Sequence, residues 1–398
     1  MSSTLIEISN NIDVRANNAR KIIMALRNSP PVTKKDLADS IGLSLPTITN
    51  ICKVLAKHDY ISECGSVDSY VGRKPALISL NKCSRLSVGV SISTHLAAIA
   101  IVDFGGEILY QDTRNFPYSG TKAYWTKLAR YIDSILEESG VDTTKIVGVR
   151  IAMPHVFDPD CWLLAGLKSR PRGMVSYSEI PTYFKYKTDI ITASEAAGIP
   201  RFWYGNIEAD CVVVLLSRYV EGCIVHRDPS TKAISTKICP LGHMTLKYDG
   251  DECFCGKRGC FQTYCSTSRI VDMANGLDTL KHFTAEYVKK PIIYLDSFFA
   301  GVGEGNEEFT ALWDDYLDKL SYAIHNLRLL FRSDIIICGE ISSNIAKYKK
   351  VLIDKIDSLS NFKDDVDGYL HTSSLAKYDT CVGAALSLCD SILIDLFE

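Results

Sequence analysis

The sequence has no hydrophobic run long enough to cross a membrane. No stretch of about 18 or more residues is both apolar and uncharged, which is the length that a transmembrane helix needs. The opening segment MSSTLIEISNNIDVRANN also has no basic part followed by an apolar part, the pattern of a secretory signal. We therefore expect a cytoplasmic protein with no membrane partner.

Low-complexity sequence is missing too. The chain has no tract of Pro, Gly or Gln, and 46% of its residues are hydrophobic while 23% are charged, as in a globular protein. At 398 residues it exceeds what one hydrophobic core usually serves. We expect two or three domains.

Charge is unevenly distributed along the chain. Residues 1–84 carry eleven Lys and Arg against seven Asp and Glu, a net charge of +4, whereas residues 85–398 carry 33 against 40, a net charge of −7. A mildly basic head on an acidic body is typical of a nucleic-acid-binding domain joined to another domain.

Three helical patterns follow one another between residues 19 and 57. The first ends before Pro30, and the second follows Thr33 as its N-cap and stops at Gly42. The third follows Ser44 as its N-cap, so the last two form a helix-turn-helix. If the apolar side chains of the third helix are buried, its outer face carries groups suited to base edges and phosphates: Thr47, Thr49, Asn50 and Lys53. We predict that these residues and Ser44 bind DNA; an ordinary helical hairpin with a solvated polar face is the alternative.

The next segment has the pattern of a wing. Two short β-like runs, residues 60–61 and 76–80, flank a polar loop that contains Gly72, Arg73 and Lys74. Glycine permits close approach, and the two cations could bind phosphates or enter a minor groove. We predict DNA contacts for Arg73 and Lys74, with a simple surface hairpin as the alternative.

Beyond residue 84 strands and helices alternate. A β-rich run at 86–111 contains a Gly-Gly turn, and four further segments are candidate buried strands: 146–154, 189–194, 211–217 and 334–340. Amphipathic helical patterns lie between them, for example through Leu128 and Ile132 and through Leu320 and Ile324. This order predicts an α/β body, which we expect to have two lobes.

Cysteine is abundant, with fourteen residues in the chain. In a reducing compartment most of these should be thiols, and several lie in apolar runs where cysteine behaves as a small buried hydrophobe. The segment 243–260, HMTLKYDGDECFCGKRGC, is different because it places one histidine and three cysteines within eighteen positions. The alternatives are a disulfide pair, a chance cluster and a metal site.

Several motifs together resemble the ROK family of repressors and sugar kinases. They are the winged head followed by GRKPALISLN, the hairpin segment AIAIVDFGGEIL, the block GHMTL…CFCGKRGCFQTYCS and the late strand LRLLFRSDIIICGE. The resemblance implies a two-lobed, ribonuclease-H-like body of the kind found in sugar kinases and actin. It divides the chain into a head at 1–84, a first lobe at 85–200 joined by a C-terminal helix at 380–398, and a second lobe at 201–379.

The resemblance also favours the metal site, because the cysteine block is similar to the family signature C-x-C-G-x-x-G-C. It assigns His243, Cys253, Cys255 and Cys260 as ligands, and one imidazole with three thiolates is the ligand set of a closed tetrahedral zinc site. Four protein ligands leave no open coordination position. We therefore expect a structural Zn²⁺ that orders a loop and does not activate water.

Kinase activity is not expected, because two functional positions of the family's kinases differ here. The kinases' D-x-G-G-T phosphate loop, aligned without gaps, falls on residues 91–95, where Ser91 replaces the aspartate and both glycines are missing. Their Asn-Asp pair, whose aspartate acts as the catalytic base, falls on Thr192 and Ala193. Alanine cannot accept a proton.

The sugar-binding positions of the family are also altered. Two glutamates that flank the cysteine block in sugar-binding members are replaced by Pro240 and Gln262, while His243 is retained. We take Thr192, His243 and Gln262 as candidate effector contacts. Either the ligand differs from ordinary hexoses, since each unpaired buried hydroxyl costs about 1–3 kcal/mol, or the cleft binds none.

Three functions remain open from the sequence. The first is a transcriptional regulator, a repressor by preference, that binds a pseudo-palindromic double-stranded DNA operator as a homo-oligomer, a dimer or a tetramer, and senses a sugar-derived effector. The second is an effector-independent DNA-binding or scaffold protein. The third is a sugar kinase with a regulatory head.

Overall fold

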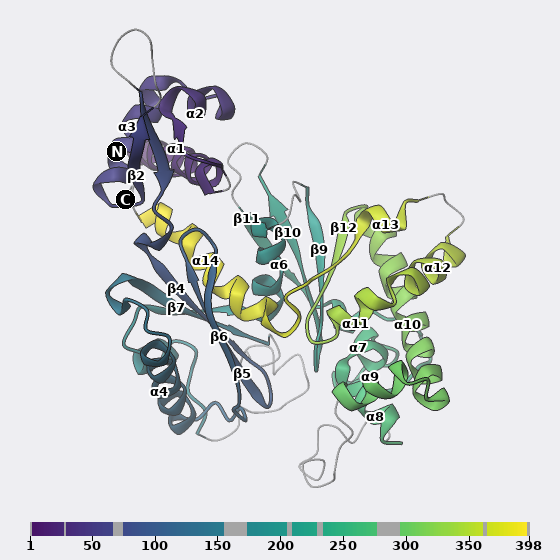
Figure 1. Ribbon diagram of the computed structural model, residues 1–398. Helices are drawn as coiled ribbons and strands as arrows, with labels where there is room; N and C mark the ends of the chain where they lie inside the picture. Colours follow the sequence, from purple (N-terminus) through teal and green to yellow (C-terminus); the bar gives the residue numbers. More distant parts are fainter. Residues whose placement is uncertain are drawn as a thin grey trace.

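The computed structural model describes residues 2–27, 29–66, 75–154, 173–204, 209–228, 234–276, 295–360 and 364–395. Within these ranges the chain forms a small head and a body built on two sheets (Figure 1). The predicted class, an α/β chain with a winged helix-turn-helix before a two-lobed body, is confirmed. In the part of the chain that the structure describes, none of the helices combines the length and apolarity needed to span a bilayer.

The head contains three helices and a three-stranded sheet of order β1-β3-β2. Its elements are α1 (Ser2–Arg27), β1 (Val32–Thr33), α2 (Lys34–Ile41), α3 (Leu45–Lys57), β2 (Ile61–Ser66) and β3 (Ala76–Leu80). Thr33 caps α2 in a capping box with Asp36, and Gly42 ends α2 with a φ of 69°. Ser44 caps α3 by accepting a hydrogen bond from the Thr47 amide. The local signals that predicted the helix-turn-helix are therefore the ones that form it.

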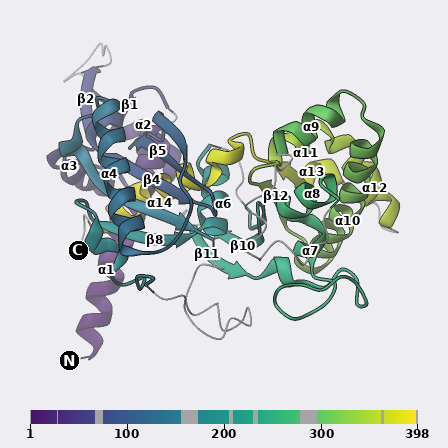
Figure 2. The ribbon, with the colours of Figure 1, turned by 90° about the horizontal axis from the view of Figure 1, so that it is seen from below.

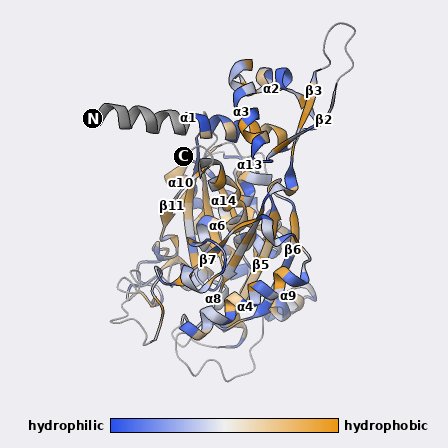
Figure 3. Ribbon diagram, turned by 90° about the vertical axis from the view of Figure 1, so that its left-hand side faces the viewer, coloured by the Kyte–Doolittle hydropathy of each residue, from blue (hydrophilic) through white to orange (hydrophobic). Residues whose placement is uncertain are grey.

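The first lobe of the body has a five-stranded sheet of order β6-β5-β4-β7-β8. Its elements are β4 (Leu86–Ile92), β5 (Leu96–Asp103), β6 (Ile108–Asn115), α4 (Lys122–Glu138), β7 (Ile146–Met153) and β8 (Thr188–Thr192). β4, β5 and β6 form an antiparallel meander, whereas β7 and β8 extend the sheet in parallel. In Figure 3 much of β5 is coloured as hydrophobic, which fits its burial on both faces.

The second lobe repeats this strand order as β11-β10-β9-β12-β13. Its strands are β9 (Cys211–Leu216), β10 (Val220–Arg227), β11 (Ile234–Cys239), β12 (Asp334–Cys338) and β13 (Leu370–Thr372). Again an antiparallel meander is extended by two parallel strands. Helices follow the meander and the parallel strands: α7 (Phe261–Cys265), α8 (Thr267–Ala274), α9 (Leu295–Gly303), α10 (Glu307–Phe331), α11 (Ser342–Lys347), α12 (Lys349–Leu359) and α13 (Val366–Tyr369).

Two helices lie between the sheets, α6 (Ala193–Tyr204) and α14 (Asp379–Asp395) (Figures 1 and 2). Glycines allow these helices to approach closely. A Cβ at Gly89 would lie 1.8 Å from the Cys381 carbonyl oxygen, and one at Gly383 would lie 1.7 Å from the Ala196 carbonyl oxygen. α14 thus packs on the first sheet and on α6, and the outer faces of the sheets are covered by α4 on one side and by α10 on the other.

The domain boundaries predicted from the sequence stay a prediction. The boundary after residue 200 falls inside α6, which runs on to Tyr204 and contacts both α14 and the second sheet. The head boundary at residue 84 coincides with the end of a short 3₁₀ helix, Lys82–Ser84, just before β4.

Candidate metal centre and nucleic-acid interface

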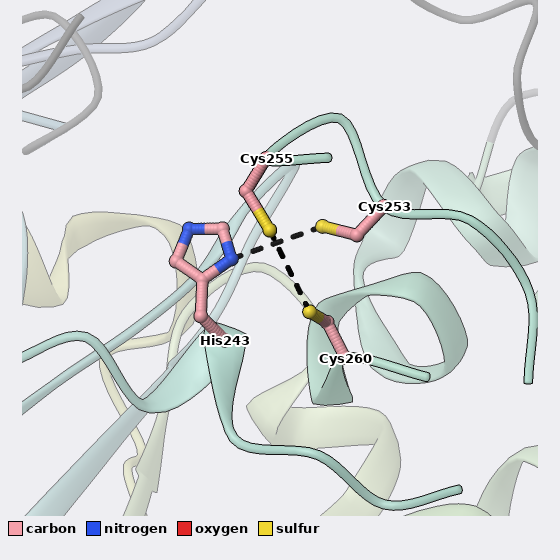
Figure 4. Close-up of side chains that lie close together, drawn as sticks. All are labelled: His243, Cys253, Cys255 and Cys260. Carbon is pink, nitrogen blue, oxygen red and sulfur yellow. Dashed lines mark hydrogen bonds between the residues drawn. The ribbon is translucent and has the colours of Figure 1, made fainter. Parts of the chain in front are cut away.

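Four side chains with metal-binding atoms come together beyond β11. His243 ends a 3₁₀ turn (Leu241–His243), Cys253 and Cys255 lie in the loop that follows, and Cys260 is the N-cap of α7. Their ligand atoms all lie within 4.8 Å of one another. His243 Nδ1 is 3.8 Å from Cys253 Sγ, and Cys255 Sγ is 3.7 Å from Cys260 Sγ (Figure 4). The four side chains point toward a common centre and could hold one metal ion.

The geometry does not support the disulfide alternative. Two bonded sulfurs lie about 2.05 Å apart, whereas Cys255 Sγ and Cys260 Sγ are separated by 3.7 Å. All thirteen cysteines in the described ranges are free thiols.

The backbone of the metal loop, residues 243–260, is closed by its own hydrogen bonds. The Cys253 amide donates to the Lys257 carbonyl at 2.8 Å, and the Leu246 amide donates to the Gly259 carbonyl at 2.8 Å. Gly259 has a φ of 72°, and a Cβ there would lie 1.5 Å from the Lys247 carbonyl oxygen. Only glycine fits this position without movement of the backbone, so Gly259 brings Cys260 back toward Cys253 and Cys255.

Electrostatics indicates that this cluster is suited to a cation. Burial raises the pKa of the Cys253 thiol and of the Cys260 thiol, and burial together with Lys257 lowers the pKa of His243. Three thiolates packed this closely repel one another unless a positive ion lies between them. A bound divalent metal removes this repulsion and deprotonates coordinating thiols outright.

Gln262, a candidate effector contact, is directed toward the same cluster. Its Nε2 donates to Cys253 Sγ at 3.2 Å, and its side chain is buried. An amide N–H that donates to a ligand sulfur stabilises the thiolate and fixes its orientation. Two of the three candidate effector residues, His243 and Gln262, are therefore engaged with the metal cluster.

The outer face of α3 carries the predicted DNA contacts. Asn50 and Lys53 are exposed, and Ser44 is exposed at the N-cap. The two threonines are half-buried and their hydroxyls bond locally, Thr47 Oγ1 with Ser44 Oγ at 2.8 Å and Thr49 Oγ1 with the Leu45 carbonyl at 2.8 Å. Arg73 and Lys74 lie outside the described residues.

Two further exposed residues lie at the start of α3, beside the predicted DNA contacts, and the sequence did not predict a role for them. Leu45 and Pro46 occupy the first turn of α3; both are exposed, and Leu45 is 47% exposed. Their positions directly after the N-cap were the signal that could have identified them, because the N-terminal residues of a recognition helix are the ones that reach base edges.

The positions that the sequence alignment pairs with the Asn-Asp pair of the family's kinases lie at the end of a strand. Thr192 ends β8 and Ala193 begins α6, so the pair occupies a strand-to-helix junction. The Thr192 hydroxyl donates to Glu195 Oε2 at 2.7 Å, and Ala193 is 6% exposed. Neither side chain offers a group that could take a proton from a sugar hydroxyl.

The turn after β4, which contains the other aligned kinase positions, contacts the second lobe. Ser91 lies near the end of β4, and the Ser93 amide closes the turn by donating to the Leu96 carbonyl at 2.9 Å. His95 in this turn is 3.4 Å from Arg218 Nη1, in the β9–β10 turn. Burial and Arg218 lower the pKa of His95, so the imidazole stays neutral beside the guanidinium at neutral pH.

The head is packed on the body through a mixed apolar and cationic contact. Arg27, at the end of α1, donates to the Trp203 carbonyl at 2.8 Å, and its guanidinium carbon lies 4.2 Å from the centroid of the Trp203 ring. Tyr60 of the head meets Phe104 of the first lobe with ring centroids 4.9 Å apart. These contacts couple the position of the head to α6 and to the first sheet.

A cavity of about 500 Å³ lies beside this contact. It is lined by the β5–β6 turn, the last turns of α6, β12 and the segment after β13, and it includes Arg201, Tyr204 and Ser373. The Arg201 guanidinium bonds His371 Nδ1 at 3.3 Å, and Tyr204 donates to the Gly106 carbonyl at 2.6 Å.

Comparisons with known proteins agree with this architecture. Residues 206–388 match the model of the ROK family, and residues 15–62 match a model described as winged helix-turn-helix DNA-binding. A xylose repressor from Bacillus subtilis is 22% identical over 269 residues, 67% of this chain and 70% of that protein.

Two solved structures share the fold. A ROK family transcriptional regulator described as a homologue of the Escherichia coli MLC protein superposes with a TM-score of 0.70 at 17% identity, covering 97% of this chain and 99% of that one. A ROK family glucokinase from Streptomyces griseus, in complex with glucose and AMPPNP, gives 0.56 at 17% identity, covering 75% of this chain and 98% of that one. The second lobe and the head of this chain thus match the ROK family model and the winged helix-turn-helix model, and the two-sheet body has the fold of these ROK family structures.

Proposed function

We propose that this protein is a transcriptional repressor that binds double-stranded DNA through its head. The observation that carries the proposal is the capped helix-turn-helix, whose second helix, α3, turns Asn50 and Lys53 to solvent beside a wing. The similarity to the Bacillus subtilis xylose repressor supports it. Asn50 is suited to a base edge and Lys53 to a phosphate, with Ser44, Thr47 and Thr49 beside them. Arg73 and Lys74 of the wing complete the proposed surface.

DNA binding by this surface requires two copies of the head. A single helix-turn-helix contacts one half-site, and symmetric oligomers bind two half-sites about one helical turn apart. We propose a homo-oligomer, a dimer or a tetramer, on a pseudo-palindromic operator. Relative movement of the lobes would change the spacing of the heads through the contacts of Arg27 with Trp203 and of Tyr60 with Phe104.

For the metal site we propose a structural Zn²⁺ held by His243, Cys253, Cys255 and Cys260. The set of one nitrogen and three sulfurs suits this ion, and four protein ligands would complete a tetrahedral shell around it. When bound, the ion supplies charge that holds three thiolates together. The chain's own residues do the rest: Gly259 closes the loop and Gln262 orients Cys253.

Phosphoryl transfer is not part of the proposal. Ala193 occupies the aligned position of the base and Ser91 that of the phosphate-loop aspartate, so the cleft has neither the base nor the glycines that approach a nucleotide. The body would instead sense a ligand, for which Thr192, His243 and Gln262 are the candidate contacts. A constitutive DNA-binding protein is the second candidate, because Gln262 already bonds a metal-ligand sulfur.

The test is selection of bound sequences from random DNA with the full-length, metal-loaded protein. We expect one preferred, two-fold related site and an affinity that falls steeply with salt. Equal binding to all sequences at moderate salt would contradict the proposal, as would sugar-dependent ATP turnover.

A second experiment separates a sensor from a constitutive binder. Thermal unfolding is followed with xylose, hexoses, amino sugars and their phosphates, each at high concentration. A ligand at 100 times its Kd stabilises the folded protein by about 2.7 kcal/mol. If a sugar raises the unfolding temperature of the wild type but not of Gln262→Ala, the proposed contacts are supported. If the effect is lost only in Arg201→Gln, the ligand binds in the cavity beside the head. If no sugar changes the unfolding temperature, the constitutive DNA-binding protein is supported.

A further inference from the structure

The first turn of α3 presents an apolar surface where a reading helix usually presents polar groups. Leu45 is 47% exposed and Pro46 is exposed beside it, directly after the Ser44 cap. At 100° per residue, Pro46 and Asn50 lie about 40° apart on one side of the helix, and Leu45 lies at the edge of that side, about 100° from Pro46. The first turn therefore presents hydrocarbon next to the side that carries Asn50.

Leu45 does not contribute to the core of the head. The core contains Ile48, Ile51, Cys52 and Leu55 of the same helix, whereas Leu45 is not among its buried residues and is 47% exposed. Fold stability thus gives no reason for a large apolar side chain at this position. A shorter or polar residue would serve the helix start equally well.

The hydroxyl groups of the nearby threonines already form hydrogen bonds within the protein. Thr47 Oγ1 bonds Ser44 Oγ, and Thr49 Oγ1 donates to the Leu45 carbonyl. In the first turn of α3, the surface that can meet a major groove is therefore mainly the Leu45 side chain and the Pro46 ring. The complementary feature of a major groove is the C5-methyl group of thymine, the one apolar group that base edges display there.

We propose that Leu45, supported by Pro46, recognises a thymine methyl group in each half-site of the operator. The inference rests on the proposed DNA-binding function and deepens it by naming a base and an atom. Asn50, one turn beyond Pro46 on the same side, would then read a neighbouring base edge. Specificity at the thymine position would depend on the methyl group and not on hydrogen bonding.

The test replaces thymine by deoxyuridine, which removes only the methyl group. The operator is first obtained by selection with the full-length protein, and each thymine of one half-site is then replaced in turn. At one thymine we expect the wild-type affinity to fall about fourfold, the effect of exposing one buried methyl group. Leu45→Ala should bind the thymine operator about fourfold or more weakly, and should no longer distinguish thymine from deoxyuridine at that position.

Two further variants test whether the effect is specific to an apolar side chain at position 45. Val14→Ala removes a side chain that is 54% exposed on α1 and is not part of the proposed DNA-binding surface, so it should leave the discrimination between thymine and deoxyuridine unchanged. Leu45→Met keeps an apolar side chain at this position and should retain most of the discrimination between thymine and deoxyuridine. Thermal unfolding should show all three variants to be as stable as the wild type.

The failures are distinguishable. An operator that is bound specifically, yet tolerates deoxyuridine at every thymine, overturns the role of Leu45 and leaves the repressor proposal intact. If Leu45→Ala still distinguishes thymine from deoxyuridine, the role of Leu45 is likewise overturned and the repressor proposal stands. A protein that selects no sequence at all overturns the DNA-binding function itself.

Discussion

The two lobes have the same strand order but stabilise corresponding loops by different means. In each lobe the antiparallel meander ends in a strand, β6 or β11, and a loop leads from it to the next helix. In the first lobe this loop, residues 116–121 and here called the aromatic loop, is fixed by rings. In the second lobe the corresponding connection contains the metal loop.

The aromatic loop packs its rings into the hydrophobic core of the first lobe. Phe116 packs edge to face on Tyr124 at 5.1 Å, Tyr118 contacts both Tyr124 and Trp125, and Trp125 donates to the Gly120 carbonyl at 3.2 Å. The metal loop exposes many of its residues, and Tyr248 is 88% exposed. A loop with so little apolar surface to bury needs another source of stability, which the proposed metal centre would supply.

Removal of the metal should have the largest effect and should be confined to the second lobe. Cys260→Ser weakens the ligand set and leaves closely packed thiols without a counterion. Structural zinc sites contribute roughly 10 kcal/mol or more to the folding of small domains. We expect zinc content to fall and amide exchange in 244–260 to accelerate, while exchange in 116–121 stays slow.

Cys265→Ser is the matched control, since Cys265 is buried in α7 but lies outside the ligand cluster. It should keep its full zinc content. Equal exchange in 244–260 for Cys260→Ser and the wild type would show that the metal loop is fixed without the ion.

Loss of Trp125 should produce the reciprocal effect in the first lobe. Trp125 is fully buried, and Trp125→Ala should lower the free energy of unfolding by about 3–5 kcal/mol. Exchange in 116–121 should accelerate without any change in zinc content. Trp313→Ala removes an equally large buried side chain from the second lobe and should leave exchange in 116–121 unchanged; if it does not, the aromatic loop has no independent stability.

Two glycines of the metal loop allow the cost of a steric clash to be compared with the cost of a left-handed backbone conformation alone. Gly256 and Gly259 both have positive φ, 84° and 72°, but only Gly259 would place a Cβ against a backbone atom, while Gly256 faces open space. Gly259→Ala should cost about 3 kcal/mol or more and weaken zinc binding, whereas Gly256→Ala should cost about 1 kcal/mol. The measurements are chemical denaturation and competition for zinc with a chelator, and equal losses in the two variants would contradict the steric argument.

The sequence predicted what depends on local signals. Thr33, Gly42 and Ser44 mark helix ends through their own backbone preferences, and the buried strands 211–216 and 334–338 read as apolar runs. The cluster of His243, Cys253, Cys255 and Cys260 was predicted because its spacing resembles a family motif, and the structure brings the four side chains together. Contacts between distant segments were not predicted: Arg27 and Trp203 lie 176 residues apart, and nothing near either one indicates the pairing.

The hydrogen-bond partner of Gln262 could not be read from the sequence either. Alignment with sugar-binding members placed it in an effector site, whereas the structure directs its amide to Cys253 Sγ. An aligned position gives the location of a side chain but not the partner of its polar end, which here depends on how the loop 243–260 folds back onto α7.

Gln262 therefore gives the smallest and most discriminating prediction. Gln262→Leu keeps the volume of the side chain but removes the N–H that donates to Cys253 Sγ, so zinc affinity should fall roughly 10-fold, the lower end for partners of metal ligands. Gln262→Glu replaces the donor by a carboxylate, which repels the thiolate, and should weaken zinc binding further. Chelator competition measures both, with Thr263→Val, a neighbour on α7, as the control. If both variants bind zinc as tightly as the wild type but lose a sugar-dependent thermal shift, Gln262 serves the effector, and the metal loop depends on its ligands and glycines alone.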